Sequence, residues 1–246
     1  MSTEPTQTPP DLVPMRPQVY KDPRPKEYFD GFHARVRRGR PDWMYELVRV
    51  VTSVYAWVVF RMRGIDAHKV PSEEQVIIAP NHFSFMDHFF VGASIRRRVQ
   101  FMAKSQLFKR PMQFVYTHGG VFPVRRGVRD EDVFVTAHAV LARKGCIVMY
   151  CEGGRSRTGI LSEKPKRGIG KLALESGAVI VPTAIVGSSK VRNWKKLQFP
   201  RVAVQYGDPL RWERVETPTP EQQQAVADEI FTRIRALYGE LETRVG

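Results

Sequence analysis

Short apolar runs alternate with longer amphipathic stretches from residue 72 onward, and this alternation constrains the fold of the 246-residue chain most. Runs of about four to eight apolar residues between turn residues are typical of buried strands, whereas a period of about 3.6 residues indicates helices. Strands and helices in alternation predict a mainly parallel sheet that is covered on both faces. We therefore expect an α/β fold with a mostly parallel mixed sheet flanked by helices.

The pattern assigns each element to a residue range. Strands are predicted at 75–79, 99–103, 120–124, 146–150, 179–186 and 201–206, and helices at 84–94, 105–117, 130–143 and 167–176. A last helix is expected to begin at Pro220, behind Thr219 as N-cap and with Gln222 three residues after the cap. Its apolar stripe is expected to pack on the body of the protein.

The N-terminal part of the chain differs from the rest in amino-acid composition. Residues 1–40 hold many of the prolines and a basic run, so we expect a mobile arm with a short helix near residues 28–38. The apolar residues 50–60 would extend only about 16 Å as a helix, roughly half of a hydrocarbon core. We therefore interpret residues 41–65 as an amphipathic membrane-interface helix; an ordinary core-packing helix is the alternative. Residues 66–246 then form the main domain.

Charge and cysteine content limit the partners and the compartment. The chain has 39 Lys+Arg against 25 Asp+Glu, a formal net charge of +14, which attracts phospholipid surfaces, nucleic acid or phosphate-bearing substrates without choosing among them. Cys146 and Cys151 lie five residues apart in one apolar run, and in an extended strand they would face opposite sides and be too distant for a disulfide. Reduced cysteines and the absence of a secretory signal near the N-terminus indicate a cytosolic location.

The first candidate site directly follows the predicted strand at 75–79. His82 and Asp87 lie five residues apart, so on a regular helix their side chains would point about 140° apart. For them to meet, His82 must lie in a loop and Asp87 in the first turn of the following helix. A neutral His82 would then remove the proton of an acceptor hydroxyl, while Asp87 fixes its tautomer. A purely structural His and Asp pair is the alternative.

Four blocks together resemble a known family. They are Asn81-His82 followed by Asp87, then residues 120–126 (GVFPVRR), 152–156 (EGGRS) and 181–185 (VPTAI). In this order they are similar to the four motifs of the 1-acylglycerol-3-phosphate acyltransferases, which are glycerolipid acyltransferases with a His-x4-Asp motif. The likeness covers roughly residues 70–210. Gly154 stands where the family commonly has Thr, which leaves fine substrate preference in question.

The resemblance implies roles for individual residues. It makes His82 and Asp87 catalytic and assigns the acceptor phosphate to Arg125, Glu152, Gly153 and Arg155. Supporting positions are Asn81, Lys104, Gly154, Ser156 and Pro182, and no metal is expected. The residues agree, because glycines let a phosphate approach the backbone and arginines offer planar forks for its oxygens. Glu152 is expected to orient an arginine or bind acceptor hydroxyls; a solvated basic turn is the alternative for this block.

The implied function is transfer of a fatty acyl group from acyl-CoA or acyl carrier protein to lysophosphatidic acid, giving phosphatidic acid in phospholipid biosynthesis. The expected place is the cytoplasmic face of the cell membrane, as a peripheral or monotopic protein without nucleic acid or prosthetic group. Glycerol 3-phosphate, another lysophospholipid or an amine-bearing lipid are alternative acceptors. A non-enzymatic basic module that binds membranes or nucleic acid is the alternative from another class. P-loop, nucleophile-elbow and zinc-ligand patterns do not occur in the sequence.

Overall fold

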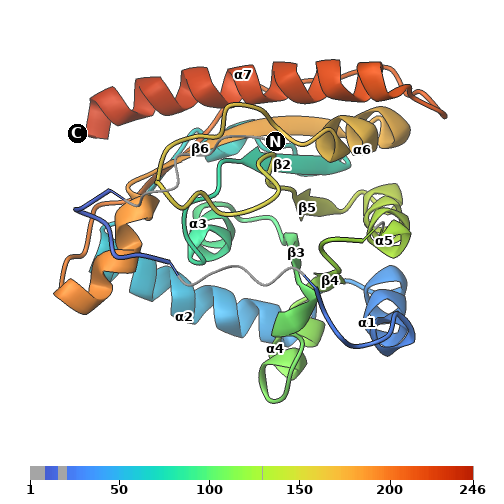
Figure 1. The fold of residues 1–246 in the computed structure, drawn as a ribbon, viewed down its shortest axis with the longest axis horizontal. Coiled ribbons are helices and arrows are strands. Elements are labelled where there is room, and N and C mark those ends of the chain that lie inside the picture. Colours follow the sequence, from blue (N-terminus) through green and yellow to red (C-terminus); the bar gives the residue numbers. More distant parts are fainter. Residues whose placement is uncertain (1–8, 16–20, 129, 246) are drawn as a thin grey trace.

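A seven-stranded sheet lies at the centre of the computed structural model, which describes residues 9–15, 21–128 and 130–245 (Figure 1). The order is β1-β7-β6-β2-β5-β3-β4. The strands are β1 (Arg63–Ile65), β2 (Val76–Pro80), β3 (Gln100–Lys104), β4 (Phe122–Val124), β5 (Cys146–Val148), β6 (Val179–Val186) and β7 (Ala203–Tyr206). Neighbouring strands are parallel except for the antiparallel pair β6 and β7. The predicted mostly parallel mixed sheet is confirmed.

Helices cover both faces of this sheet. They are α1 (Glu27–Arg38), α2 (Trp43–Phe60), α3 (Asp87–Ser94), α4 (Met112–His118), α5 (Glu131–Ala142), α6 (Gly168–Ser176) and α7 (Pro220–Val245). Three 3-10 helices are η1 (Ala67–Lys69), η2 (Ser105–Leu107) and η3 (Ser188–Lys196). The long helix α7 lies along β6 and α6 on one side of the molecule, while α2 lies on the opposite side (Figure 1).

The central strand β2 shows why both faces need cover. Val76 and Ile78 join the core cluster that also contains α2 and α3 residues, whereas Ile77 and Ala79 join the cluster with α5, α6 and α7. Successive side chains of a strand point to opposite faces, so an unbroken apolar run is buried on both sides. Cys146 belongs to the first cluster and Cys151 to the second, and both thiols are free as predicted.

The start of α7 follows the predicted capping box. Thr219 Oγ1 accepts from the Gln222 backbone N–H at 3.3 Å, and Gln222 Oε1 accepts from the Thr219 backbone N–H at 2.8 Å. These two bonds satisfy donors that the first helical turn would leave without partners. Ile230, Ile234 and Leu241 are buried against the sheet side, as the predicted stripe requires.

Three differences from the predicted elements have local causes. The short strand β1 was not predicted, because Arg63 and Gly64 are exposed and it gains its strand form only from pairing with β7. The predicted helix at 105–117 is divided into η2 and α4, since Pro111 lacks an N–H and disfavours a helical Arg110. The helix predicted from residue 84 begins at Asp87 instead.

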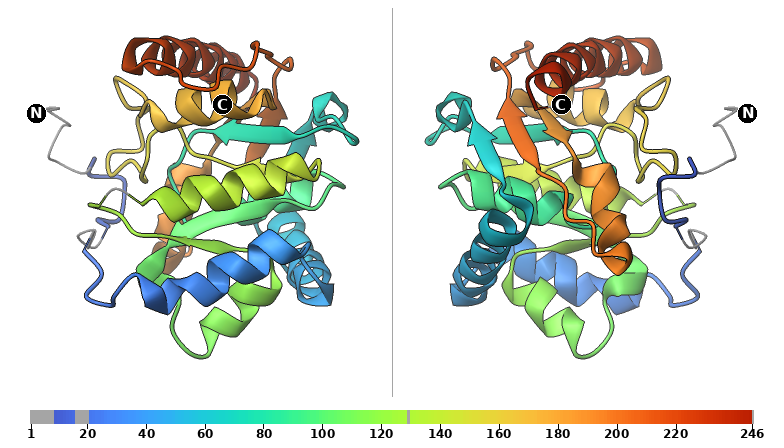
Figure 2. Two further views of the ribbon diagram at one scale, coloured as in Figure 1. Left: turned by 90° about the vertical axis from the view of Figure 1, so that its right-hand side faces the viewer. Right: turned by 90° about the vertical axis from the view of Figure 1, so that its left-hand side faces the viewer.

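The prediction of a mobile N-terminal arm is wrong for residues 21–40. Phe29 and Val36 of α1 are buried, and His33 Nδ1 lies 2.9 Å from Thr136 Oγ1 of α5. Arg24 donates hydrogen bonds to the carbonyls of η2 and Phe108 at 2.6 Å each. Helix α1 therefore packs beside α5 (Figure 2), and the predicted short helix is confirmed. The arm's residues 1–8 and 16–20 lie outside the described residues.

Helix α2 presents an entirely apolar face to solvent. It begins behind Asp42, whose carboxylate accepts from the Met44 backbone N–H at 3.0 Å, and it packs on α3. Its exposed residues are Trp43, Leu47, Val50, Val51, Val54, Tyr55, Trp57 and Val58. Within the described part of the chain, α2 is the one helix long and apolar enough to cross a membrane, and 28% of it is buried. Its 18 residues exceed the apolar run because the helix includes residues 43–49.

Candidate active site

The candidate site begins where β2 leaves the sheet. The Asn81 side chain accepts from the Ile185 backbone N–H at 2.7 Å and donates to the Ile185 carbonyl at 3.0 Å. Both groups are buried, so this pair of bonds fixes the end of β2 against β6. The following residue, His82, is thereby held in a loop at the carboxyl end of a central parallel strand, the usual place for ligands in such sheets.

His82 and Asp87 meet at this point. His82 Nδ1 lies 2.8 Å from Asp87 Oδ2, and Asp87 is the first residue of α3. The same carboxylate oxygen accepts from the backbone N–H groups of Phe83 and Ser84, each at 2.8 Å. The predicted arrangement, with His82 in the loop and Asp87 in the first helical turn, is confirmed. The bond to Nδ1 leaves Nε2 as the basic ring nitrogen.

The surroundings keep the His82 imidazole neutral near pH 7. Burial lowers the pKa of His82; the hydrogen bond and charge of Asp87 oppose this, and the positive charges of Arg155 and Arg126 add to the lowering. A cation is unfavourable in an apolar site that already faces two guanidinium groups. A neutral imidazole held by a carboxylate is the state that a general base requires.

The loop at 152–156 supports His82 from the other side. Glu152 Oε1 accepts from the His82 backbone N–H at 2.8 Å, and Glu152 Oε2 accepts from the N–H and hydroxyl of Ser162 at 3.1 and 2.7 Å. Ser156 donates its backbone N–H to the His82 carbonyl at 2.9 Å. Burial raises the pKa of the Glu152 carboxyl. Glu152 and Ser156 thus position the loop of His82, while a contact between Glu152 and the acceptor stays a prediction.

Gly153 occupies a conformation that favours glycine. Its φ is +69°, and a Cβ at this position would lie 2.9 Å from Lys166 Cγ. Its backbone N–H closes a turn on the Tyr150 carbonyl at 3.1 Å. Glycine is therefore required by the turn itself. The close approach of a phosphate to Gly153 and Gly154 stays a prediction.

Positive charge gathers around the loop. Burial lowers the pKa of Lys104, at the end of β3, and the charges of Arg126 and Arg155 lower it further. Lys104, Arg126 and Arg155 thus form one group of cations, in which the charges of Arg126 and Arg155 lower the pKa values of both Lys104 and His82. Arg125, the residue predicted to bind phosphate, is the neighbour of Arg126 in one Arg-Arg pair, and sequence spacing alone does not separate the two. Arg125 donates its backbone N–H to Asp130 Oδ2 at 2.7 Å.

Pro182, predicted as a supporting residue, lies inside β6 rather than at the site. It pairs with Ala79 of β2, and its carbonyl accepts from the Gly207 backbone N–H at 2.8 Å. Its position therefore supports the sheet beneath the site. Among the residues that the structure describes, no group of three or more His, Cys, Asp or Glu side chains is placed to hold a metal ion.

Two aromatic neighbours of His82 were not predicted from the sequence. The Tyr150 ring stacks on the imidazole, with ring centroids 3.8 Å apart and planes 16° from parallel. Burial raises the pKa of the Tyr150 hydroxyl, which has no hydrogen-bond partner among the described residues. The His88 ring lies 6.3 Å from that of His82, and burial lowers its pKa to about 4. Tyr150 was expected inside a strand, but β5 ends at Val148.

A family model matches the part of the chain that carries this site. The model named Acyltransferase matches residues 61–186, which include the dyad, the cationic group and the 152–156 loop.

Three curated relatives are similar to this chain. It is 28% identical over 152 residues to the glycerol-3-phosphate acyltransferase of Aeromonas hydrophila, covering 55% of this chain and 19% of that protein. It is 27% identical over 143 residues to a chloroplastic 1-acyl-sn-glycerol-3-phosphate acyltransferase of Arabidopsis thaliana, covering 56% and 39%. A protein of the same name from Cocos nucifera is 23% identical over 190 residues, covering 74% and 59%. The chain thus spans less than two thirds of each of these relatives.

A solved structure agrees at the level of the fold. The crystal structure of the 1-acyl-sn-glycerophosphate acyltransferase of Thermotoga maritima matches with a TM-score of 0.62 and 18% identity, covering 85% of this chain and 88% of that one. The family model covers more than half of this chain, and the residues that it matches include those of the site described above. This chain therefore belongs to the acyltransferase family.

Proposed function

We propose that this protein transfers a fatty acyl group from a thioester, on coenzyme A or acyl carrier protein, to the free hydroxyl of lysophosphatidic acid. The contact that carries the proposal is the 2.8 Å approach of His82 Nδ1 to Asp87 Oδ2 at the end of β2. The names of the Arabidopsis thaliana and Cocos nucifera relatives favour this acceptor over others. The product would be phosphatidic acid, a step of phospholipid biosynthesis.

The dyad supplies the proton chemistry of such a transfer. Nε2 of His82 takes the proton of the acceptor hydroxyl while the hydroxyl oxygen attacks the thioester carbonyl carbon, and Asp87 stabilises the resulting imidazolium. The tetrahedral intermediate then collapses, the carbon–sulfur bond breaks, and the imidazolium returns the proton to the leaving thiolate. The acceptor provides the nucleophilic oxygen, so the protein needs no Ser or Cys nucleophile.

The cationic group offers a place for the acceptor phosphate. Arg155, Arg126 and Lys104 lie close enough to His82 or to one another for their charges to shift pKa values at the site. An anionic headgroup bound there would bring the neighbouring glycerol hydroxyl towards the imidazole. The predicted contributions of Arg125 and Gly153 belong to the same proposal.

Glycerol 3-phosphate is a second candidate acceptor. The observation that favours it is the similarity to the glycerol-3-phosphate acyltransferase of Aeromonas hydrophila, which matches this chain at 28% identity. The same dyad and cationic group would serve it, because it too carries a phosphate and a free hydroxyl. Assaying a panel of acceptors with one acyl donor, and mapping the position of the new ester, separates the two candidates.

The proposed location is the cytoplasmic membrane surface, with α2 lying in the interface. All exposed residues of α2 are apolar, while its other face packs on α3. A helix that is apolar on its outer face and packed on a domain on its inner face suits a peripheral or monotopic protein. The net charge of +14 would add attraction to anionic lipids.

The dyad can be tested by replacing its base. We expect His82→Ala to lower acyl transfer by about 10²–10⁴-fold, the usual contribution of a general base, while the protein stays folded. His138→Ala is the matched control, since His138 is half-buried on α5 and pairs with Glu175 instead. Thiol release should be measured with and without the acceptor. Wild-type turnover by His82→Ala would reject the assignment. Thiol release by the wild type no faster than without protein, whether or not the acceptor is present, would favour the non-enzymatic alternative.

The acceptor site can be tested in the same assay. We expect Arg155→Ala to raise the acceptor KM by about tenfold or more, because a charge-assisted bond to the phosphate is lost. Arg211→Ala removes an equal charge from an exposed pair with Glu74 and should leave KM unchanged. An unchanged KM for Arg155→Ala would count against the phosphate role.

A further inference from the structure

Residues 188–200, here called the 188–200 segment, hold apolar side chains in solvent. Trp194 is 51% exposed, Leu197 80% and Phe199 38%. Leu197 follows η3 with a φ of +54°, a left-handed conformation that bulky side chains rarely adopt. An exposed leucine in this conformation opposes folding in water, and such features cluster where a protein contacts something else.

The 188–200 segment continues the apolar face of α2. The Phe199 ring lies 6.2 Å from the ring of Phe60, the last residue of α2. Arg61 Nη2 donates to the Phe199 carbonyl at 2.7 Å, and Val202 donates its backbone N–H to the Phe60 carbonyl at 3.1 Å. Figure 1 shows η3 at the C-terminal end of α2. The 188–200 segment and the exposed Tyr55 of α2 therefore pack on the same buried ring, since the Phe60 ring also lies 5.5 Å from the Tyr55 ring.

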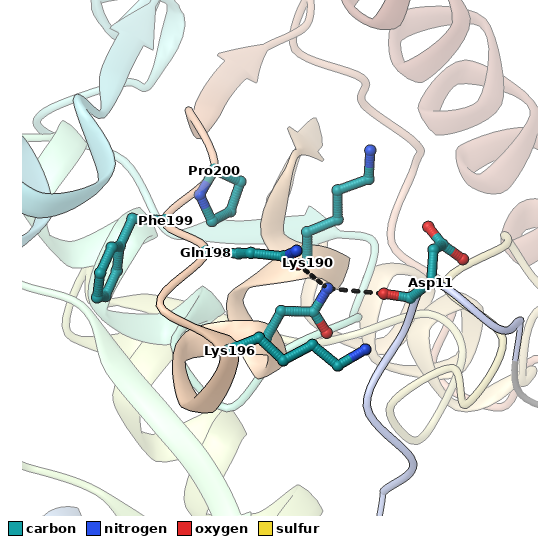
Figure 3. A pocket seen from close by; sticks show the side chains of 7 residues that line it. Asp11, Lys190, Lys196, Gln198, Phe199 and Pro200 are labelled. Atoms are coloured by element: carbon teal, nitrogen blue, oxygen red, sulfur yellow. Dashed lines mark hydrogen bonds between the residues drawn. The ribbon is translucent and has the colours of Figure 1, made fainter.

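Positive charge accompanies these apolar residues. The 188–200 segment contains four basic residues and no acidic one. Lys190 and Lys196 are exposed and line a hollow of about 460 Å³ together with Asp11 and Phe199 (Figure 3). Lysines beside aromatic and aliphatic side chains suit a bilayer surface, where apolar side chains are buried about 5–10 Å into the headgroup/acyl boundary and the lysine ammonium groups stay in water. A protein partner would need acidic side chains for the lysines and apolar side chains for Trp194, Leu197 and Phe199, all on one surface, whereas an anionic bilayer offers both kinds of contact everywhere.

The segment is also tied to the active site. Arg192, which is half-buried, donates to the Ser189 carbonyl at 2.9 Å and to the Arg157 carbonyl at 2.8 Å. The neighbouring Ser156 donates its backbone N–H to the His82 carbonyl at 2.9 Å. A short chain of direct bonds therefore joins the 188–200 segment to the loop that holds the imidazole.

We propose that the 188–200 segment is a second membrane contact, which inserts Trp194, Leu197 and Phe199 into the headgroup region of an anionic phospholipid bilayer. Lys190 and Lys196 contact the lipid phosphates, and Arg192 holds the 152–156 loop at the bilayer surface. The membrane contact itself does not depend on acyl transfer. Only its effect on turnover rests on the proposed function.

The contact is tested by vesicle binding of the full chain. We expect Leu197→Asn to weaken binding to phosphatidylcholine vesicles containing phosphatidic acid by about tenfold, since a leucine side chain leaves the lipid. Asparagine tolerates the left-handed conformation, so the fold should be unchanged in a thermal melt. Val135→Asn on α5 is the matched control, because Val135 is 52% exposed but lies outside both apolar surfaces. Equal binding by wild type and Leu197→Asn would overturn the proposal.

Two further measurements separate the contribution of the lysine charges from that of the inserted side chains. Lys190→Gln with Lys196→Gln should weaken binding to anionic vesicles by about tenfold at low salt and leave binding to phosphatidylcholine alone unchanged. Tryptophan quenching by brominated lipids should drop in Trp194→Phe relative to wild type. Self-association without vesicle binding would overturn the proposal in favour of a protein partner.

The link to turnover uses two forms of the acceptor. We expect Leu197→Asn to lower transfer to vesicle-borne lysophosphatidic acid several-fold but not transfer to a short-chain, monomeric acceptor. Equal loss on both acceptors would overturn the surface role. If the wild type transferred no acyl group to any acceptor, the proposed function would be wrong. The vesicle-binding experiments would still decide whether the 188–200 segment contacts the membrane.

Discussion

Tyr150 gives His82, the proposed base, a second constraint beyond Asp87. The carboxylate fixes one ring nitrogen at 2.8 Å, but a single hydrogen bond leaves the ring free to turn about it. The stacked phenol, 3.8 Å away, restricts that rotation and sets the plane of the imidazole. Because a base misplaced by about 1 Å can cost about 10²-fold in rate, the stack bears directly on turnover.

We expect Tyr150→Leu to lower kcat by about 10–100-fold with little change in KM, because the base is misoriented while the acceptor site stays intact. Tyr150→Phe keeps the stack and removes a buried hydroxyl that has no partner among the described residues, so it should turn over like wild type. Steady-state kinetics of both variants check this. A wild-type kcat for Tyr150→Leu would show that Asp87 alone orients the ring.

Sequence could predict the dyad but not its aromatic support. His82 and Asp87 lie in one short stretch, so spacing and helix geometry were enough to bring them together. Tyr150 lies just beyond the C-terminal end of β5 and far from His82 in the sequence, so no local spacing predicts that the two rings stack. Arg126 was missed for a related reason, since neighbouring arginines look alike until the backbone direction is known.

At the scale of elements, one glycine sets the distance between α6 and α7. A Cβ on Gly170 would lie 1.9 Å from the Gln223 carbonyl oxygen of α7. We expect Gly170→Ala to destabilise the protein by about 1–3 kcal/mol, because two helix backbones would have to move apart. Gly239→Ala is the control: nothing lies within 4 Å of its Cβ, and it should stabilise by up to about 1 kcal/mol. Urea unfolding midpoints measure both, and a stable Gly170→Ala variant would show that the helices can separate freely.

Elements with strong local patterns were predictable, and those formed by distant pairing were not. Strand β6 coincides with its predicted range because eight apolar residues are buried on both faces. The capping box of α7 could be predicted from Thr219, Pro220 and Gln222 alone. Strand β1, in contrast, has an exposed arginine and glycine and depends on hydrogen bonds to β7, about 140 residues later in the chain.

At the scale of the whole molecule, three histidines with lowered pKa values tie stability to pH. Burial is the main cause that lowers the pKa of His33, His82 and His88 below the ordinary value of 6.5, to about 4 for His88. Below pH 6.5 the unfolded chain therefore binds more protons than the folded one, so stability falls as the pH falls. We expect a lower free energy of unfolding at pH 5 than at pH 7.5, measured by denaturant titration.

Other groups mostly act in the same direction. The lowered pKa values of Asp42 and Glu46 also favour the folded state at higher pH, whereas the raised pKa of Glu152 acts against this trend. His88→Gln should flatten the pH dependence between 6.5 and about 4, because its charge-free side chain removes one buried titrating group. A protein that is equally stable at pH 5 and 7.5 would contradict the lowered pKa values of these three histidines.

The overall architecture was predictable because alternation of strand and helix extends over most of the chain. The N-terminal arm was not, since α1 contributes only Phe29, His33 and Val36 to the interior and is otherwise polar. A proline-rich and basic stretch with so few apolar residues has the sequence pattern of an unfolded tail. Its order comes from contacts with α5 and η2 that no local pattern contains.

The Asn81 side chain behaves like an extra peptide group at the end of β2. Its amide offers one donor and one acceptor to Ile185, as a neighbouring strand would, after the main chain of β2 has already turned away. The loop of the base thereby shares the rigidity of the innermost strands. If His82 acts as the proposed base, an arriving acceptor finds the imidazole already in position, and none of its binding energy is spent on ordering that ring.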